Sequence, residues 1–231
     1  IFNKKGKRIG VLKKWGKHIS NGNNAWVVND SIYHSGKIFK RNGKYRFYTP
    51  GAFDEVFFPK DTIDISLKIS KENNKNDSQN MRDAKTVSFS IGSEDTEQRK
   101  GGMNKKLAVF SVDMQKYYNY IISDTIYKER SCYAFYVKLK EDLLEKDKKD
   151  VLIHKVVSFF DKTNFNVIYR EYKFVYNHLL FDLDIDIIVH MDYINQKHVP
   201  IDIYYKGFWD ILFFKPEYAE FTLNNTDYIV E

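Results

Sequence analysis

Cysteine, proline and long apolar runs are scarce in this chain. The shortage of cysteine and the shortness of the apolar runs each exclude a class of protein or site. The 231 residues include four prolines and a single cysteine, Cys132. One thiol excludes a disulfide framework and any zinc site built on several thiolates, and it favours an intracellular, reducing compartment, with an organelle or a virus particle left open. The longest apolar runs, such as 132–137, stop far short of the roughly 18 residues that span a bilayer, so we expect no transmembrane segment.

Apolar residues are nevertheless plentiful, at 43% of the chain, and 16% of the residues are aromatic. This composition supplies a sizeable core and excludes wholesale disorder. Strict alternation of apolar and polar residues indicates half-buried strands. Such alternation occurs at 62–70, 85–91, 133–139 and 179–189. The sequence therefore predicts an α+β fold, mainly antiparallel β with one or two helices.

The two helices are expected in the middle of the chain. One is predicted at 113–122, where Asp113 is a candidate N-cap and apolar residues recur at helical spacing. The second is predicted to begin near Glu141 and to run towards Val156.

Two polar stretches, 71–84 and 92–106, contain too few apolar residues to be anchored in a core, and we expect mobile loops there. The chain then divides into a basic, β-rich N-terminal region, 1–70, and an α+β region, 85–231. A single domain that carries both loops is the alternative.

Charge is distributed unevenly along the chain. Residues 1–50 carry 12 basic residues and one acidic residue, a net charge of +11, whereas 51–170 carry +2 and 171–231 carry −7. A compositional bias towards lysine, such as an AT-rich coding sequence produces, would scatter lysines evenly along the chain. A concentration at one end instead creates a field that attracts a polyanion, so the N-terminal end is the candidate binding surface.

A turn at Asn42-Gly43 is the strongest short hairpin signal in the sequence. A two-residue turn pairs Arg41 with Lys44 and Phe39 with Arg46, which gathers cations and two aromatic rings on one face. Cations bind phosphates and rings stack on bases, so this surface suits nucleic acid. Packing of the rings on lysine stems or on a neighbouring subunit is the open alternative. The candidate nucleic-acid-binding residues are Lys37, Phe39, Arg41, Lys44, Arg46 and Tyr48 on the hairpin, with Lys13, Lys14, Trp15 and Lys17 on the preceding strand.

The segment 9–16, Ile-Gly-Val-Leu-Lys-Lys-Trp-Gly, followed by Trp26, resembles the opening of a pleckstrin-homology domain. In that family a strand of this kind and a basic loop meet phosphoinositide headgroups. The resemblance implies a phosphoinositide-binding module as an alternative function.

Three carboxylates, Asp182, Asp184 and Asp186, alternate along one predicted strand and are expected on one face, roughly 7 Å apart. Such a row can share Mg²⁺ for phosphoryl chemistry. The run 180–184 resembles the first motif of haloacid-dehalogenase-type phosphatases, which implies Asp182 as nucleophile and Asp184 as acid. It also resembles the Asp-x-Asp metal motif of archaeo-eukaryotic primases. The alternative is that the carboxylates line the solvated face of an ordinary strand.

Other candidate chemistry is sparse. Asp161 with Glu171-Tyr172-Lys173 resembles the Asp and Glu-x-Lys of restriction-type nucleases, which implies Mg²⁺ and a water-orienting lysine. His190 and Asp192 are the one candidate metal-binding pair among the histidines. Cys132 begins an apolar strand and reads as a buried residue without a catalytic partner. The sequence predicts no catalytic residue, bound metal or cofactor.

The C-terminal region is dense in aromatic residues, and 207–214 is apolar on both of its faces if it is a strand. Such a strand is either central in a sheet or covered by a partner. Together with the basic end, this predicts a non-catalytic structural or nucleic-acid-associated subunit of a larger assembly, either a ribonucleoprotein or a virion. A Mg²⁺-dependent phosphoryl-transfer enzyme that uses the carboxylate strand is the alternative.

Overall fold

In a computed structural model of the chain, the structure describes residues 1–21, 24–64, 106–178, 181–194, 197–211 and 215–229. It is mainly antiparallel β with three short helices in these ranges, so the predicted fold class is confirmed. The chain divides into two compact units. The N-terminal unit comprises 1–95 with 213–219, and the second unit comprises 96–212 with 220–231.

Three antiparallel strands make up the small sheet of the N-terminal unit, β1 (Gly10–Asn21), β2 (Asn24–Gly36) and β3 (Ile63–Asp64). β1 and β2 are paired over their whole lengths, from Asn21 opposite Asn24 to Gly10 opposite Gly36. The register shifts by one residue beside Trp15, because Trp15 pairs with Ser31 and Gly16 pairs with Asn29. Asp30 is therefore the extra residue of a bulge in β2.

A helix, α1 (Tyr48–Phe57), follows the β1–β2 hairpin. The helix begins without a side-chain cap from its own N-cap residue. Instead Glu217, in the segment of the last strand that belongs to the same unit, accepts the backbone N–H groups of Tyr48 (2.7 Å) and Thr49 (2.8 Å). Because Pro50 has no N–H, these two hydrogen bonds satisfy most of the N–H groups that lack a partner within the first turn of the helix.

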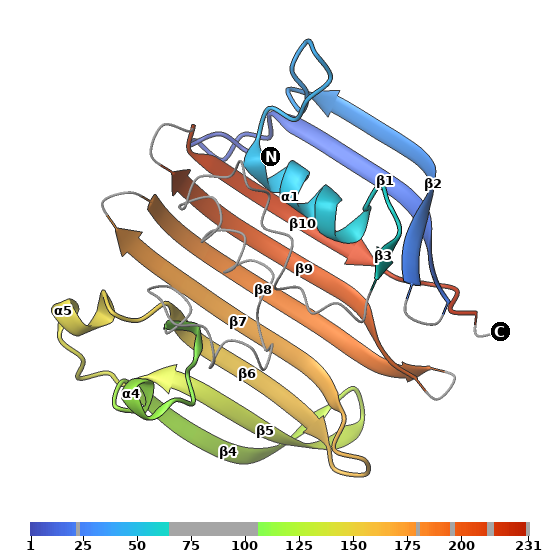
Figure 1. The fold of residues 1–231 in the computed structure, drawn as a ribbon. Coiled ribbons are helices and arrows are strands. Elements are labelled where there is room, and N and C mark those ends of the chain that lie inside the picture. The colour runs from blue at the N-terminus through green and yellow to red at the C-terminus, as the bar shows by residue number, and fades with distance from the viewer. Residues whose placement is uncertain (22–23, 65–105, 179–180, 195–196, 212–214, 230–231) are drawn as a thin grey trace. The chain divides into compact units, whose positions relative to one another are not determined.

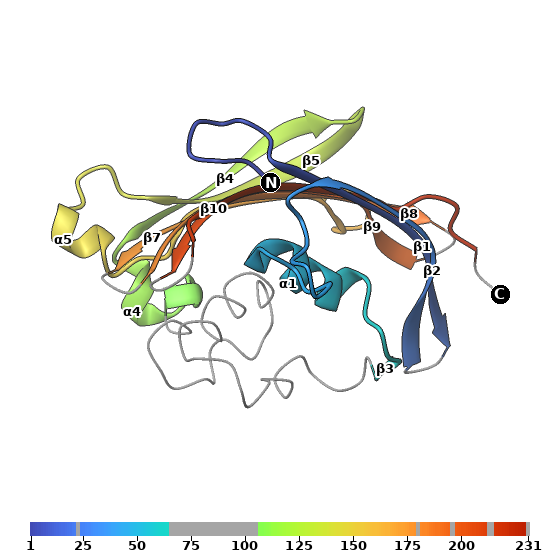
Figure 2. The ribbon, with the colours of Figure 1, turned by 90° about the horizontal axis from the view of Figure 1, so that it is seen from above.

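A larger sheet contains seven antiparallel strands in the order β10-β9-β8-β7-β6-β5-β4, as Figure 1 shows. Figure 2 views these strands from above and shows that β4 to β9 form a curved layer. The strands follow one another in sequence and each pairs with its predecessor. Their bounds are β4 (Tyr118–Tyr127), β5 (Arg130–Leu139), β6 (Ile153–Asp161), β7 (Val167–His178), β8 (Phe181–Ile194), β9 (Lys197–Ile211) and β10 (Glu217–Asn224).

The register of this sheet separates an apolar face from a polar face. Directly opposed residues lie on the same face, so the chain of partners Val137, Val156, Tyr172 and Ile187 defines the apolar face. Phe174, Leu183 and Ile185, which are among the most buried residues of the second unit, lie on this face. Cys132, Ala134 and Val157 are buried on the opposite face. The polar face carries most of the charged residues of β6 to β9. The predicted strand at 133–139 is confirmed within β5, and the part of the predicted strand 179–189 that the structure describes, 181–189, is confirmed within β8.

The helix predicted at 113–122 is wrong. Only Val112–Gln115 is helical there (α4), and β4 begins at Tyr118. The tyrosines and isoleucines of this segment satisfy a helical spacing, but they are also strong strand formers, and ten consecutive pairs with β5 decide the outcome. The helix predicted from Glu141 to Val156 is likewise reduced to one turn, α5 (Glu145–Lys148), because Ile153 already starts β6.

The turn at Asn42-Gly43 exists, but the predicted register is wrong by one residue. Phe39 is bridged to Tyr45, and the Lys40 N–H donates to the Lys44 carbonyl at 2.8 Å. The loop therefore has three residues and ends in Gly43, whose φ of 77° is the left-handed value this loop type requires. The shift places Phe39 opposite Tyr45 instead of Arg46.

The predictions for 85–91 and 71–84 lie outside the described residues, as do most of 62–70 and all of 92–106 except Lys106. The domain boundary predicted in this part of the chain stays a prediction for the same reason. In the ranges that the structure describes, no helix has the length and apolar character needed to cross a membrane.

Candidate nucleic-acid interface

Lys13, Trp15 and Lys17 lie on one face of β1, because side chains alternate along a strand. All three are exposed, and the Trp15 side chain is 50% accessible. Tyr33 lies directly opposite Lys13 on β2 and is 52% accessible. This face, which we call the outer face, therefore presents two ammonium groups and two open aromatic rings side by side.

The bulge in β2 decides which residues stand on the outer face. An unbroken register from Asn21 and Asn24 would place Ile32 opposite Lys13 and Asp30 opposite Trp15. The extra residue shifts Tyr33 and Ser31 into these positions instead. Asp30, the only acidic residue among the first fifty, thus has no partner on β1 in the ladder.

Lys14 points to the opposite face of β1, where α1 lies. Its ammonium forms an ion pair with Asp54 and lies 5.2 Å from the centre of the Phe58 ring. The Tyr45 hydroxyl donates to the other oxygen of Asp54 at 2.8 Å, and burial, followed by this hydrogen bond, raises the pKa of Tyr45. Lys14 thus holds the helix to the sheet and is separated from the other candidate lysines of β1.

The hairpin cations Lys37, Arg41, Lys44 and Arg46 are all exposed. None of them forms an ion pair within the part of the chain that the structure describes, and the same holds for Lys13 and Lys17. With respect to the carboxylates of the described residues, these six charges are available to an external anion. The six residues, together with Trp15 and Tyr33, are the candidate interface.

The remaining predicted residues have other surroundings. The Phe39 ring contacts the rings of Tyr45 and His34, with centroids 4.9 Å apart in each case. Tyr48 begins α1 and donates its backbone N–H to Glu217. The structure therefore does not place Phe39 and Tyr48 with Trp15 as a common stacking platform.

In the second unit, by contrast, several cations have carboxylate partners. Among its described residues, Arg130 and six lysines have carboxylate partners within 4.0 Å. The pairs include Lys155 with Glu171 at 2.7 Å and Lys162 with Asp124 at 2.5 Å. The lysines with carboxylate partners are Lys106, Lys148, Lys155, Lys162, Lys173 and Lys206.

The carboxylates Asp182, Asp184 and Asp186 do alternate on the polar face of β8, as the sequence predicts. The Lys173 ammonium, on β7, contacts both Asp184 and Asp186, the latter at 3.0 Å. Burial disfavours the charged ammonium, but the hydrogen bonds to these two carboxylates outweigh it and raise the pKa of Lys173. A lysine thus supplies the positive charge between the two carboxylates.

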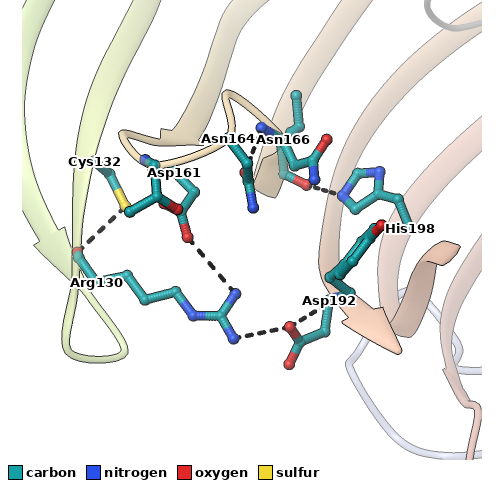
Figure 3. A network of polar contacts seen from close by, with 10 residues as sticks. Arg130, Cys132, Asp161, Asn164, Asn166, Asp192 and His198 are labelled. Atoms are coloured by element: carbon teal, nitrogen blue, oxygen red, sulfur yellow. Dashed lines mark hydrogen bonds and ion pairs between the residues drawn. The ribbon is translucent and has the colours of Figure 1, made fainter. Parts of the chain in front are cut away.

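The Asp161 carboxylate also has partners within the chain (Figure 3). It accepts hydrogen bonds from the Thr163 N–H and hydroxyl, which hold its pKa below the usual range, and it lies 3.9 Å from Arg130. Arg130 extends to Asp192, 2.9 Å away, so the arginine joins the ends of β6 and β8. Glu171 lies opposite Val157, four residues along β6 from Asp161, or roughly 13 Å. The carboxylates expected for a nuclease are therefore not brought together.

His190 and Asp192 do not converge on a common metal position. Asp192 is held by Arg130, whereas His190 contacts the Tyr127 hydroxyl through Nδ1 and lies 3.7 Å from Asp202 through Nε2. Burial lowers the pKa of His190 and, with the nearby Asp202 charge, raises that of Tyr127. Both shifts favour the uncharged forms of these two side chains.

The described ranges contain no group of three or more His, Cys, Asp and Glu side chains placed to hold a metal ion. The Cys132 side chain is fully buried, and burial raises the pKa of its thiol. It is the small buried residue that the sequence predicts, rather than a reactive thiolate.

Comparison with known proteins gives no further guidance, because no protein-family model, curated protein or solved structure matches the chain. A function must therefore be inferred from the geometry and charge of the described residues.

Proposed function

We propose that the protein works by binding nucleic acid through the outer face of β1–β2 and the 37–46 hairpin, as a non-catalytic subunit of a larger assembly. The observation that carries this proposal is the set of six exposed cations, Lys13, Lys17, Lys37, Arg41, Lys44 and Arg46, without carboxylate partners among the described residues. Cations that contact phosphates release counterions, and this release dominates the affinity of nucleic-acid-binding proteins.

The outer face favours a single strand over a duplex. Trp15 and Tyr33 present open rings beside Lys13, and aromatic rings bind bases only when the bases are unstacked from a duplex. Stacking is tolerant of sequence because every base has a π-face. We therefore expect tight, strongly salt-dependent binding to single strands and weaker binding to duplexes.

The test compares two variants that lower the net charge equally, from +6 to +3. One replaces Lys13, Lys37 and Lys44 with Ala, and its matched control replaces Lys148, Lys155 and Lys162, which all have carboxylate partners. Binding to labelled single-stranded and duplex oligonucleotides is measured by fluorescence anisotropy at low and moderate salt. We expect about tenfold weaker binding for the first variant and little change for the control.

Two results would contradict the proposal. Equal losses in both variants would mean that total charge alone drives binding. Binding to phosphoinositide-containing vesicles without binding to either oligonucleotide would favour the pleckstrin-like alternative.

A further inference from the structure

One edge of the seven-stranded sheet is long and has no partner among the described strands. β4 is the last strand in the order, and among the described strands only β5 pairs with it. An edge strand presents a row of unpaired N–H and C=O groups that another strand can complete. Ten residues, Tyr118–Tyr127, form this edge.

Natural edges are usually protected by charges, prolines or bulges, and β4 has little of this protection. Its only charged residue is Asp124, which is already paired with Lys162 of the same chain at 2.5 Å. The strand contains no proline, and its ladder with β5 runs through ten pairs without a register shift. It is therefore a regular edge that offers no charge repulsion to an incoming strand.

Apolar side chains stand exposed along this edge. Ile122 and Ile126 are 71% and 77% accessible, far above the exposure of an isoleucine in an ordinary half-buried strand. Both lie on the apolar face, and Ile122 also lines a shallow, wholly apolar hollow with Tyr133, Phe135, Phe160 and Phe165. An exposed hydrophobic edge of this kind marks a pairing surface.

We propose that β4 pairs antiparallel with the β4 of a second copy of this chain, about a twofold axis at Ile122. Antiparallel pairing in this register places Ile122 against Ile122, Tyr120 against Asp124 and Tyr118 against Ile126 on the apolar face. No like charges meet, and an uncharged, apolar strand is matched by another of the same kind. The seven-stranded sheets of the two copies become one continuous sheet.

The opposite edge of the sheet argues for this symmetric arrangement over a head-to-tail one. Phe2 donates its N–H to the carbonyl of Tyr218 on β10 at 2.9 Å, so part of that edge is already engaged within the N-terminal unit. Pairing of β4 with β10 would also generate open-ended filaments, whereas β4 with β4 closes as a dimer.

The test measures oligomeric state by sedimentation velocity over a wide range of protein concentration. The wild-type chain is expected to dimerise, and Ile122→Lys, which opposes two ammonium groups at the twofold axis, is expected to weaken the dimer by about tenfold or more. Val112→Lys is the matched control, because Val112 is 84% accessible and lies in α4 outside the edge. An equimolar mixture of Ile122→Lys and Ile122→Glu is expected to restore the dimer.

A wild-type chain that stays monomeric at every concentration overturns the proposal. So does a dimer that Ile122→Lys leaves intact, or one that Val112→Lys weakens equally. Failure of the Lys and Glu variants to pair with each other would overturn the register centred on Ile122.

Discussion

The two units of this protein differ in how many of their cations have carboxylate partners among the described residues. In the second unit, the polar face of the sheet pairs lysines with carboxylates across neighbouring strands, as with Lys155 and Glu171 or Lys173 and Asp186. In the N-terminal unit, Lys14 is the one cation among the first fifty residues with a carboxylate partner in the described structure, and this pair joins β1 to α1. A paired face needs no external ligand, whereas an unpaired one attracts a polyanion.

Carboxylates show the same contrast. Asp184 and Asp186 are partly exposed and compensate a surface lysine, whereas Glu217 is 3% accessible and holds the first turn of α1. Asp54 and Glu217 thus serve the internal structure of the N-terminal unit. The outer face of β1–β2 is left basic, and this difference can be tested residue by residue.

The largest effect on stability is expected at Glu217. Glu217→Ala leaves the N–H groups of Tyr48 and Thr49 without their acceptor and should lower the free energy of unfolding of the N-terminal unit by about 2–3 kcal/mol. Chemical denaturation followed by tryptophan fluorescence measures this loss. Glu220→Ala, at an exposed position of the same strand, is the control and should change stability little.

The pH dependence of this site has a definite sign. Burial raises the pKa of Glu217 above its usual 4.5, so the folded state retains this proton to higher pH than the unfolded state does. The contribution to stability is therefore greatest below pH 4.5 and declines as the pH rises through the folded pKa. The stability of the wild type relative to Glu217→Gln should fall between acidic and neutral pH. A difference that grows with pH would contradict this assignment.

Trp15 should matter for binding and little for folding. Its ring stands exposed on the outer face, so Trp15→Ala is expected to weaken single-strand binding by about tenfold, the effect of losing one base stack. The midpoint of thermal unfolding should hardly move. Val28→Ala, at an exposed position of the neighbouring strand β2, is the control variant without a ring. Equal losses of binding in the two variants would argue against stacking.

The smallest effect is expected for a paired lysine of the sheet. Lys173→Met removes the charge between Asp184 and Asp186 and should cost about 0.5–1 kcal/mol, because partly exposed ion pairs contribute little. Denaturant unfolding of the variant measures this cost. Oligonucleotide binding should remain unchanged, and a large loss of binding would show that the polar face of the sheet takes part.

Strand alternation in the sequence was sufficient to locate β8, because its buried face, with Leu183 and Ile185, alternates with a polar one. It also located β5, although β5 has fully buried residues on both faces, Cys132 and Ala134 on one and Val137 on the other. It was not sufficient at β4, where tyrosines and isoleucines fit both a helical and an extended pattern and the neighbouring β5 selects the strand. Local periodicity contains no information about such a partner.

The candidate interface was predictable in composition but not in register. The concentration of lysines and arginines before residue 50 identifies the region, and Asn42-Gly43 locates the turn. The bulge at Asp30, which brings Tyr33 opposite Lys13, and the three-residue loop, which turns Phe39 towards Tyr45, have no comparable sequence signal. A shift of one residue moves a side chain to the other face, so prediction by alternation fails at such positions.

The salt dependence of single-strand affinity tests the central contrast most directly. It is measured for the wild type and for a variant in which Lys13, Lys17, Lys37, Arg41, Lys44 and Arg46 are all Ala. If these unpaired cations contact phosphates, the logarithm of the association constant should fall with the logarithm of salt concentration by about 0.7 per phosphate neutralised, and the variant should lose most of this slope. A wild-type affinity that is insensitive to salt, or a variant with an unchanged slope, would contradict the proposed interface.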